Sequence, residues 1–317
     1  MSKKIKIVIL VFVILVAFSF ARDLFIKSLI GTVTTAITGA PTSIGGFSMS
    51  VIRQSVKISD FKMYNPEGFP KDILVDIPKI GVTCNIAALF TGKIHLKELV
   101  LDIKEIGMVK NKEGELNVES LKVVSEKPKE KEKKKPAKEL AMRIDTVTLG
   151  MGRVVSKDYS AQGQPVIKVY DVNLKKTYKN INSAQQLVAL IISEPLKAAG
   201  IQGLKVYGVA MLAGVGALPV VAAFTLTGKD YAQETFNVTM DKAYDAGLQA
   251  IKMAGKLTQE NRAGGEISAE VSGAGVNLKI RKVSEKSTQV TISARKLGLP
   301  QPAIAAGVMY RLNEQLK

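Results

Sequence analysis

The segment VKISDFKM, residues 56–63, carries the pattern that decides the fold. Its apolar side chains are Val56, Ile58, Phe61 and Met63, so two alternating pairs are separated by two polar residues. Alternation with a period of two predicts a β-strand with one apolar face. The extra residue would turn the second pair to the opposite face unless the chain bulges there. The spacing therefore predicts a bulged strand.

The same spacing recurs along the first half of the chain. The further copies are Val75, Ile77, Ile80, Val82; Ile94, Leu96, Leu99, Leu101; Met142, Ile144, Val147, Leu149; and Ile167, Val169, Val172, Leu174. The inserted pairs are Ser59-Asp60, Pro78-Lys79, Lys97-Glu98, Asp145-Thr146 and Tyr170-Asp171. Successive bulges coil a sheet, so we expect a curled antiparallel sheet with one apolar side. That side is either an open groove or a core covered by helices.

An apolar segment precedes these strands. Residues 7–21 form the uncharged run IVILVFVILVAFSFA behind three lysines. A bilayer core needs about 20 helical residues, and the run reaches this length when Lys6 and Arg22 extend toward the headgroups. We therefore expect a membrane anchor over residues 1–38, with a cytoplasmic N-terminus and the bulk outside. A cleaved signal peptide is the alternative, because small residues two apart precede Arg22.

Composition excludes several kinds of chemistry. Cys84 and His95 are the sole cysteine and histidine, so the chain can form no internal disulfide, Cys/His zinc site or Ser/His/Asp relay. We interpret Cys84 as a small buried hydrophobe and His95 as a surface imidazole. The net charge of +17 suits nucleic acid or anionic lipid, but the basic residues are not interleaved with stacking aromatics. We expect no catalytic residue, metal, cofactor or nucleic-acid partner.

The middle of the chain changes in composition twice. Residues 125–139, SEKPKEKEKKKPAKE, hold too little apolar area to offset their ordering entropy and are predicted to be a solvated linker. Residues 140–180 supply further strands of the sheet. Residues 182–228 are predicted to be a helical segment, and their part 206–228 carries no charge and is long enough for a second membrane span. A packed helical hairpin or a buried strand pair is the alternative.

The C-terminal region shows cleaner periodicity. Ser183 is placed to cap a helix that Pro195 kinks or ends, and residues 231–317 read as an α-β-β-β-α unit with a hairpin turn at Gly273-Ala274-Gly275. The predicted buried positions of its two helices are Met240, Tyr244, Leu248, Ile251 and Ile304, Val308, Leu312, Leu316. Those of its strands are Ile267, Ala269, Val271; Val276, Leu278, Ile280; and Val290, Ile292, Ala294.

Residues 39–121 resemble the AsmA-like family of bacterial envelope proteins. The matching segments are GAPTSIGGFSMS (39–50), VKISDFKMYNPEGFP (56–70), DIPKIGVTCNIAALFTGKIHLKELVLDIKEIGMVKNKEGELN (76–117) and the closing LNVESL. Residues 231–317 resemble a small domain family of unknown function from bacterial lipoproteins, through GEISAEVSGAGVNLKIRK (265–282). The first resemblance implies an inner-membrane protein that faces the periplasm and takes part in outer-membrane assembly or lipid traffic.

The combined expectation is an α+β protein. It comprises a transmembrane helix (1–38), a curled antiparallel sheet of bulged strands (39–124, continued by 140–180) and a small αβββα domain (231–317). We expect a non-catalytic protein, single-pass in the inner membrane, that binds membrane lipids or an envelope protein. The candidate lipid-lining residues are Ile58, Phe61, Met63, Leu96, Leu99 and Leu101. The alternatives are a scaffold with a closed core and no groove, and an envelope enzyme.

Overall fold

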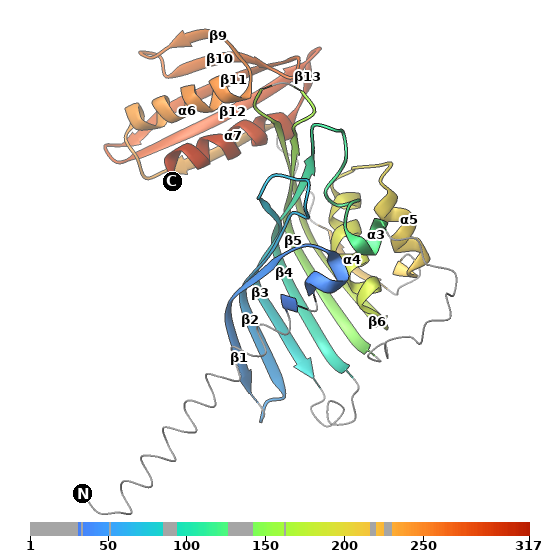
Figure 1. Cartoon of the computed structure of the whole chain (residues 1–317). Coiled ribbons are helices and arrows are strands. Elements are labelled where there is room, and N and C mark those ends of the chain that lie inside the picture. The colour runs from blue at the N-terminus through green and yellow to red at the C-terminus, as the bar shows by residue number, and fades with distance from the viewer. Residues whose placement is uncertain are drawn as a thin grey trace, which may run out of the picture.

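The structure is a computed structural model with two units, each built on a β-sheet (Figure 1). It describes residues 31–32, 34–50, 52–84, 94–125, 142–161, 163–215, 220–224 and 230–317. The apolar run at 7–21 and the linker beyond Ser125 lie outside these residues.

The first unit is a seven-stranded sheet whose strands follow chain order. They are β1 (Thr42–Ser50), β2 (Ser55–Tyr64), β3 (Ile73–Cys84), β4 (Ile94–Lys110), β5 (Met142–Asp158), β6 (Val166–Ile181) and β7 (Val220–Phe224). Neighbouring strands are antiparallel except β4 and β5, which are parallel and paired from Ile94↔Met142 to Lys110↔Asp158. A parallel pair needs a crossover connection, and the chain between Lys110 and Met142 supplies it.

The described part of this crossover packs on the apolar face of the sheet. Val118 and Leu121 are fully buried in the same core as the strands, and the short helix α3 (Lys122–Ser125) follows. Helices α4 (Ala184–Ala198) and α5 (Lys205–Leu212) complete the layer and contact α3, and α4 packs on β5 and β6. These helices lie together on one side of the sheet (Figure 1).

The strands bulge at some of the predicted sites and not at others. Ser59 pairs with Gly46 and Lys79, and Phe61 pairs with Ile44 and Ile77, so both neighbours advance by two residues across Asp60. No residue is therefore inserted at Ser59-Asp60. Asp60 instead adopts a left-handed conformation (φ 51°), which keeps the following apolar residues on the buried face. The predicted bulge at Lys97-Glu98 is confirmed, because Thr83 and Cys84 pair with Glu98 and Leu96 and leave Lys97 as an extra residue of β4. The register also shifts between β5 and β6, at Met151/Arg153, beside the left-handed Asn173.

The second unit is a six-stranded sheet with two helices. Its elements are β8 (Tyr231–Phe236), α6 (Met240–Ala254), β9 (Lys256–Asn261), β10 (Glu266–Val271), β11 (Ala274–Ser284), β12 (Ser287–Lys296), β13 (Leu299–Pro300) and α7 (Pro302–Leu316). All nine strand positions predicted to be buried are buried. The hairpin turn lies at Ser272-Gly273, both with positive φ, rather than at Gly273-Ala274-Gly275.

Helix α7 joins the two units. It packs on the face of β6 opposite to α4, where Ala306 and Tyr310 contact Val155, Ile167 and Val169. Gly307 permits this contact, because a Cβ atom there would lie 2.0 Å from the carbonyl oxygen of Ile167. The buried Arg311 donates a hydrogen bond to the carbonyl of Pro165. The two units are therefore held together by close backbone packing.

The predicted fold class is wrong in its topology. The first sheet is mixed rather than antiparallel, and the C-terminal domain has six strands, because β8, β9 and β13 accompany the predicted three. The proposed second span, 206–228, is also wrong, since α5 has eight residues and β7 belongs to the sheet.

The predicted membrane placement also requires correction. None of the helices in the described part of the chain, from residue 31 onward, is long and apolar enough to cross a membrane. The descriptions as a membrane protein with a transmembrane signal-anchor, single-pass in the inner membrane, are thus not supported by the described helices, and residues 1–30 of the predicted anchor lie outside them.

Candidate functional site

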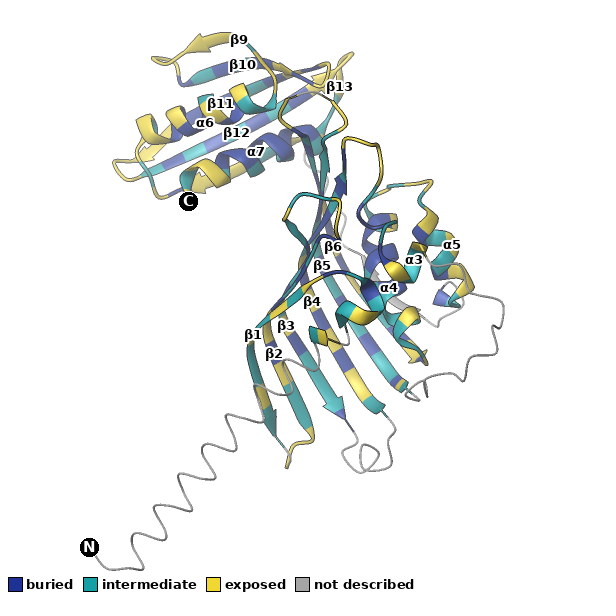
Figure 2. Cartoon of the chain, viewed as in Figure 1, coloured by how far each residue is buried: buried dark blue, intermediate teal, exposed yellow. Residues whose placement is uncertain are grey.

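The candidate lipid-lining residues lie in a core rather than on an open groove. Ile58, Phe61, Met63, Leu99 and Leu101 are only 3–9% exposed, and they share one cluster with buried side chains of α4. Figure 2 shows the buried stripes that these strands carry. Burial of such side chains stabilises a fold by about 1.5–3 kcal/mol each, which accounts for their pattern without a ligand.

Leu96 differs from the other candidates because it is partly buried. It pairs with Cys84 and Ile144 near the end of the sheet, where Val56, Val82 and Met142 are also partly buried against the core. The apolar face is thus closed by Leu190 and its neighbours at one end and less covered at the other.

The first strand forms an edge of the seven-stranded sheet (Figure 1). β1 pairs with β2, and no other described strand pairs with its outer side. Its sequence, TSIGGFSMS, contains no charged residue and no proline. Proteins normally protect edge strands with charges, proline or short length, because unpaired backbone groups recruit further strands. β1 has none of these protections.

The edge has two chemically different sides. Ile44 and Phe47 pair with Phe61 and Ile58 and pack, partly buried, against the core. On the opposite side the residues are small and exposed: Ser43 pairs with Lys62, and Ser48 pairs with Lys57. These lysines form no ion pair with another residue that the structure describes. The edge therefore has an apolar side, which faces the core, and a basic side, which faces away from it.

The glycines at the centre of β1 accommodate the kink of β2. A Cβ atom on Gly45 would lie 2.8 Å from the Cβ of Asp60, and one on Gly46 would lie 2.1 Å from the Oγ of Ser59. Both distances are shorter than carbon contacts allow, so the two strands can pair across the kink because these positions are glycines. Asp60 is the acidic residue of β2 on the basic side, and Asp76 of β3 pairs with Lys62.

Sequence reasoning missed this edge. β1 carries the recurring spacing itself, with Ile44, Phe47 and Met49 at apolar positions and Thr42 at the first. A threonine in place of an aliphatic residue hid this copy, although the absence of charge over residues 42–50 was visible.

The NPEGFP motif (65–70) has a structural role. Asn65 donates a hydrogen bond to the carbonyl of Pro70, at 2.9 Å, and accepts one from the Nδ2 of Asn117, at 2.7 Å. The fully buried Asn117 also donates to the carbonyl of Gly107 and accepts from the backbone N–H of Val109, each at 2.8 Å. The motif therefore fastens the turn after β2 to the end of β4.

A second buried polar cluster lies beneath α4. Glu194 accepts hydrogen bonds from the hydroxyl of Tyr178 and from the Nζ of Lys176, the latter at 3.0 Å, and Lys197 lies 3.4 Å away. Burial alone would raise the pKa of Glu194, but these hydrogen bonds and the lysine charges outweigh it and hold the pKa below its usual value. Tyr178 is itself buried, and its pKa is raised by that burial and by Glu194. The cluster fixes α4 to β6.

His95 and Cys84 lie apart from any such buried cluster. The Nε2 of His95 lies 2.8 Å from Asp145, which also accepts a hydrogen bond from the Nε of Arg143 at 2.7 Å, and the two hydrogen bonds lower the pKa of Asp145. Cys84 is buried, and burial raises the pKa of its thiol. Over the residues that can be described, no three His, Cys, Asp or Glu side chains are grouped to hold a metal.

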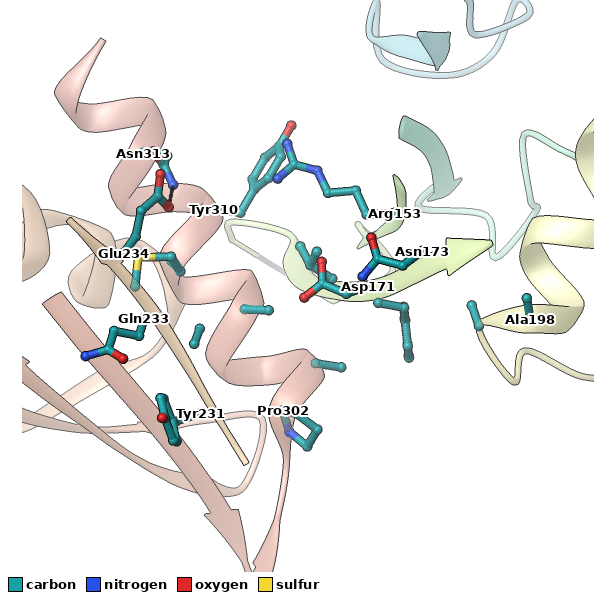
Figure 3. A pocket seen from close by; sticks show the side chains of 17 residues that line it. Arg153, Asp171, Asn173, Ala198, Tyr231, Gln233, Glu234, Pro302, Tyr310 and Asn313 are labelled. Atoms are coloured by element: carbon teal, nitrogen blue, oxygen red, sulfur yellow. Dashed lines mark hydrogen bonds between the residues drawn. The ribbon is translucent and has the colours of Figure 1, made fainter. Parts of the chain in front are cut away.

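A cleft of about 440 Å³ lies where the two units meet, between β5, β6 and α4 on one side and β8 and α7 on the other (Figure 3). Its charged groups are largely paired with protein: Arg153 with Glu105 at 2.8 Å, and Glu234 with Asn313 at 2.6 Å. The guanidinium of Arg153 also lies 5.2 Å from the ring centroid of Tyr310. The two polar pairs each lie within one unit, whereas the contact of Arg153 with Tyr310 joins the two units.

No family model matches the chain, and no curated protein matches it. The resemblance to AsmA-like proteins therefore stays a prediction. The site is defined by its own geometry, as an uncharged sheet edge with which no further described strand pairs, beside a largely covered core.

Proposed function

We propose that the protein is a non-catalytic docking scaffold that binds an extended segment of a partner protein along the outer edge of β1. The observation that carries this proposal is the contrast between the closed apolar face and the open edge. Backbone groups at such an edge bind an added strand through main-chain hydrogen bonds, and the side chains alongside select which strand is added.

The edges of the second sheet support this proposal by contrast. β9 (KLTQEN) carries Lys256 and Glu260, β8 (YAQETF) carries Glu234, and β13 has only two residues. The chain thus protects the edges of the second sheet, whereas both edge strands of the first sheet, β1 and the shorter β7 (VVAAF), are uncharged. Since an unprotected edge promotes aggregation, its retention is explained by an occupant.

The rest of the molecule suits a scaffold. Close packing of α7 on β6 keeps the two units in a fixed relation, so a partner on β1 would be held at a defined position relative to the C-terminal sheet. The resemblance of residues 39–121 to AsmA-like proteins supports a role in cell-envelope maintenance, with an envelope protein as the partner.

Site-specific crosslinking in the cells that make the protein tests docking. A photoreactive residue replaces Ser43 or Ser48 on the edge, or Gln259 on β9 as the control. The proposal predicts an adduct of one defined mass from both edge positions and none from Gln259. It also predicts loss of the adduct after Met49→Lys, because a charge on the inner side of an edge strand opposes strand addition. Equal adducts from all three positions would contradict the proposal.

Binding of an apolar ligand is a second candidate, favoured by the partly buried end of the sheet around Leu96. Native mass spectrometry of gently purified protein tests it. A bound phospholipid that disappears in Leu96→Asp without loss of folding would support this role. Protein that is folded and carries no lipid would exclude it. Phe61 and Leu99 are unsuitable for this test, since both are buried in the core.

A further inference from the structure

We infer that the segment docked on β1 alternates apolar and acidic residues in the spacing Φ-x-Φ-x-x-Φ-x-Φ, where Φ is apolar and the outer x positions are Asp or Glu. This inference rests on the proposed docking function and specifies the chemistry of the partner. It follows from the different chemistry of the two sides of the edge.

The apolar side determines the spacing. Along β1 the positions toward the core are Thr42, Ile44, Phe47 and Met49, with Gly45-Gly46 between the two pairs. A strand added to β1 must kink at the same level to keep its own apolar residues on the core side, as β2 does at Asp60. The partner therefore needs two consecutive polar residues at its centre.

The basic side determines the charge. Lys57 and Lys62 are the β2 partners of Ser48 and Ser43, so each lysine stands one strand away from the edge behind a small residue. Strands are about 4.8 Å apart, so a residue of the added strand at these levels lies about 10 Å from the lysine Cα. Extended Lys and Glu side chains together span this distance over the intervening serine. Opposite charges at these levels stabilise the pairing, while lysine in the partner would be repelled.

At the centre of the edge, the docked segment should carry neutral residues. Asp60 lies against Gly45 and Ser59 against Gly46, so the two central x positions of the partner face a carboxylate and a hydroxyl. An acidic residue there would be repelled by Asp60. The charge pattern on the basic side is thus acidic, neutral, neutral, acidic.

The test uses the whole chain and the peptide Val-Glu-Val-Ser-Ser-Val-Glu-Val carrying a fluorescent label, with binding followed by anisotropy. One control peptide replaces Glu with Lys, and a second keeps both Glu residues but has Pro at the third and sixth positions, which removes its strand N–H groups. We expect the acidic peptide to bind at least tenfold more tightly than either control. Lys57→Glu and Lys62→Glu should each weaken it roughly fivefold, as loss of about 1 kcal/mol does. Lys286→Glu, an equal charge change on the distant β11–β12 turn, should leave binding unchanged.

The outcomes separate the inference from the function on which it rests. If the Lys peptide binds as tightly as the acidic one, and Met49→Lys abolishes both, docking stands and the acidic pattern is wrong. If the Pro peptide binds equally well, or Lys286→Glu weakens binding as much as Lys57→Glu, the peptide is held by general attraction to a protein of charge +17, and the inference is overturned. If no peptide binds and sedimentation shows a dimer that Met49→Lys dissociates, the occupant is a second copy of this chain, which also overturns it.

Discussion

Replacement of Gly307 by alanine tests how the two units are joined. The added Cβ would lie 2.0 Å from the carbonyl oxygen of Ile167, whereas ordinary contact begins at 3.4 Å. Helix α7 would have to move by the difference, about 1.4 Å, away from the backbone of β6. A carbonyl within a paired strand cannot rotate away as a flexible side chain can.

Two opposing effects determine how Gly307→Ala changes the free energy of unfolding. Alanine in place of glycine inside a helix stabilises it by about 1 kcal/mol. Overpacking of a closely fitted contact costs about 1–3 kcal/mol. We therefore expect Gly307→Ala to lower the free energy of unfolding by up to about 2 kcal/mol. Gly208→Ala in α5, where a Cβ meets nothing within 4 Å, should raise it by the helix term alone.

Urea unfolding followed by far-ultraviolet circular dichroism compares the two variants with the native chain. Beyond the change in stability, Gly307→Ala should separate the transition into two, because each unit then unfolds without support from the other. If Gly307→Ala proves as stable as Gly208→Ala, with a single transition, α7 does not pack on β6 in the way described.

Three further changes test the interior. Asn117→Ala should lower the free energy of unfolding by about 3 kcal/mol in urea titrations, because it leaves buried groups of Gly107 and Val109 unpaired; a loss below about 1 kcal/mol would contradict the network. Glu194→Gln should flatten the decline of stability as the pH falls below about 5, because a carboxyl with a lowered folded-state pKa stabilises the fold above its usual pKa and loses that effect as the pH falls through the lowered value. An unchanged slope would contradict the lowered pKa. Phe61→Asp should unfold the first unit by circular dichroism, whereas Leu96→Asp should not; equal effects would contradict the difference in their burial.

Local patterns in the sequence specified much of the second unit. Alternation identified the buried faces of β10, β11 and β12, and Ser183 caps α4 by accepting a hydrogen bond from the N–H of Gln186, as predicted. β9 escaped prediction because it is polar and exposed, and its strand conformation depends on pairing with β10. Pro195 does not end α4, because the helix continues to Ala198.

The topology of the first sheet could not be predicted in the same way. The apolar spacing of β4 and β5 is compatible with either strand direction, and the parallel pairing is determined by a crossover whose path no local pattern encodes. Spacing also did not distinguish an inserted residue from the left-handed conformation of Asp60. Whether the apolar face is open depends on packing of α4, a long-range contact. The edge at β1 is likewise a consequence of strand order.

Hydrogen exchange of the whole chain, with and without the acidic peptide, tests the central claim most directly. The account predicts that amides of β4 and β5 are protected throughout. Amides on the outer side of β1 should exchange rapidly in the free monomer and become protected when the peptide binds. Protection of β1 in the free monomer, or rapid exchange of β1 that a saturating peptide does not change, would contradict an open docking edge beside a closed core.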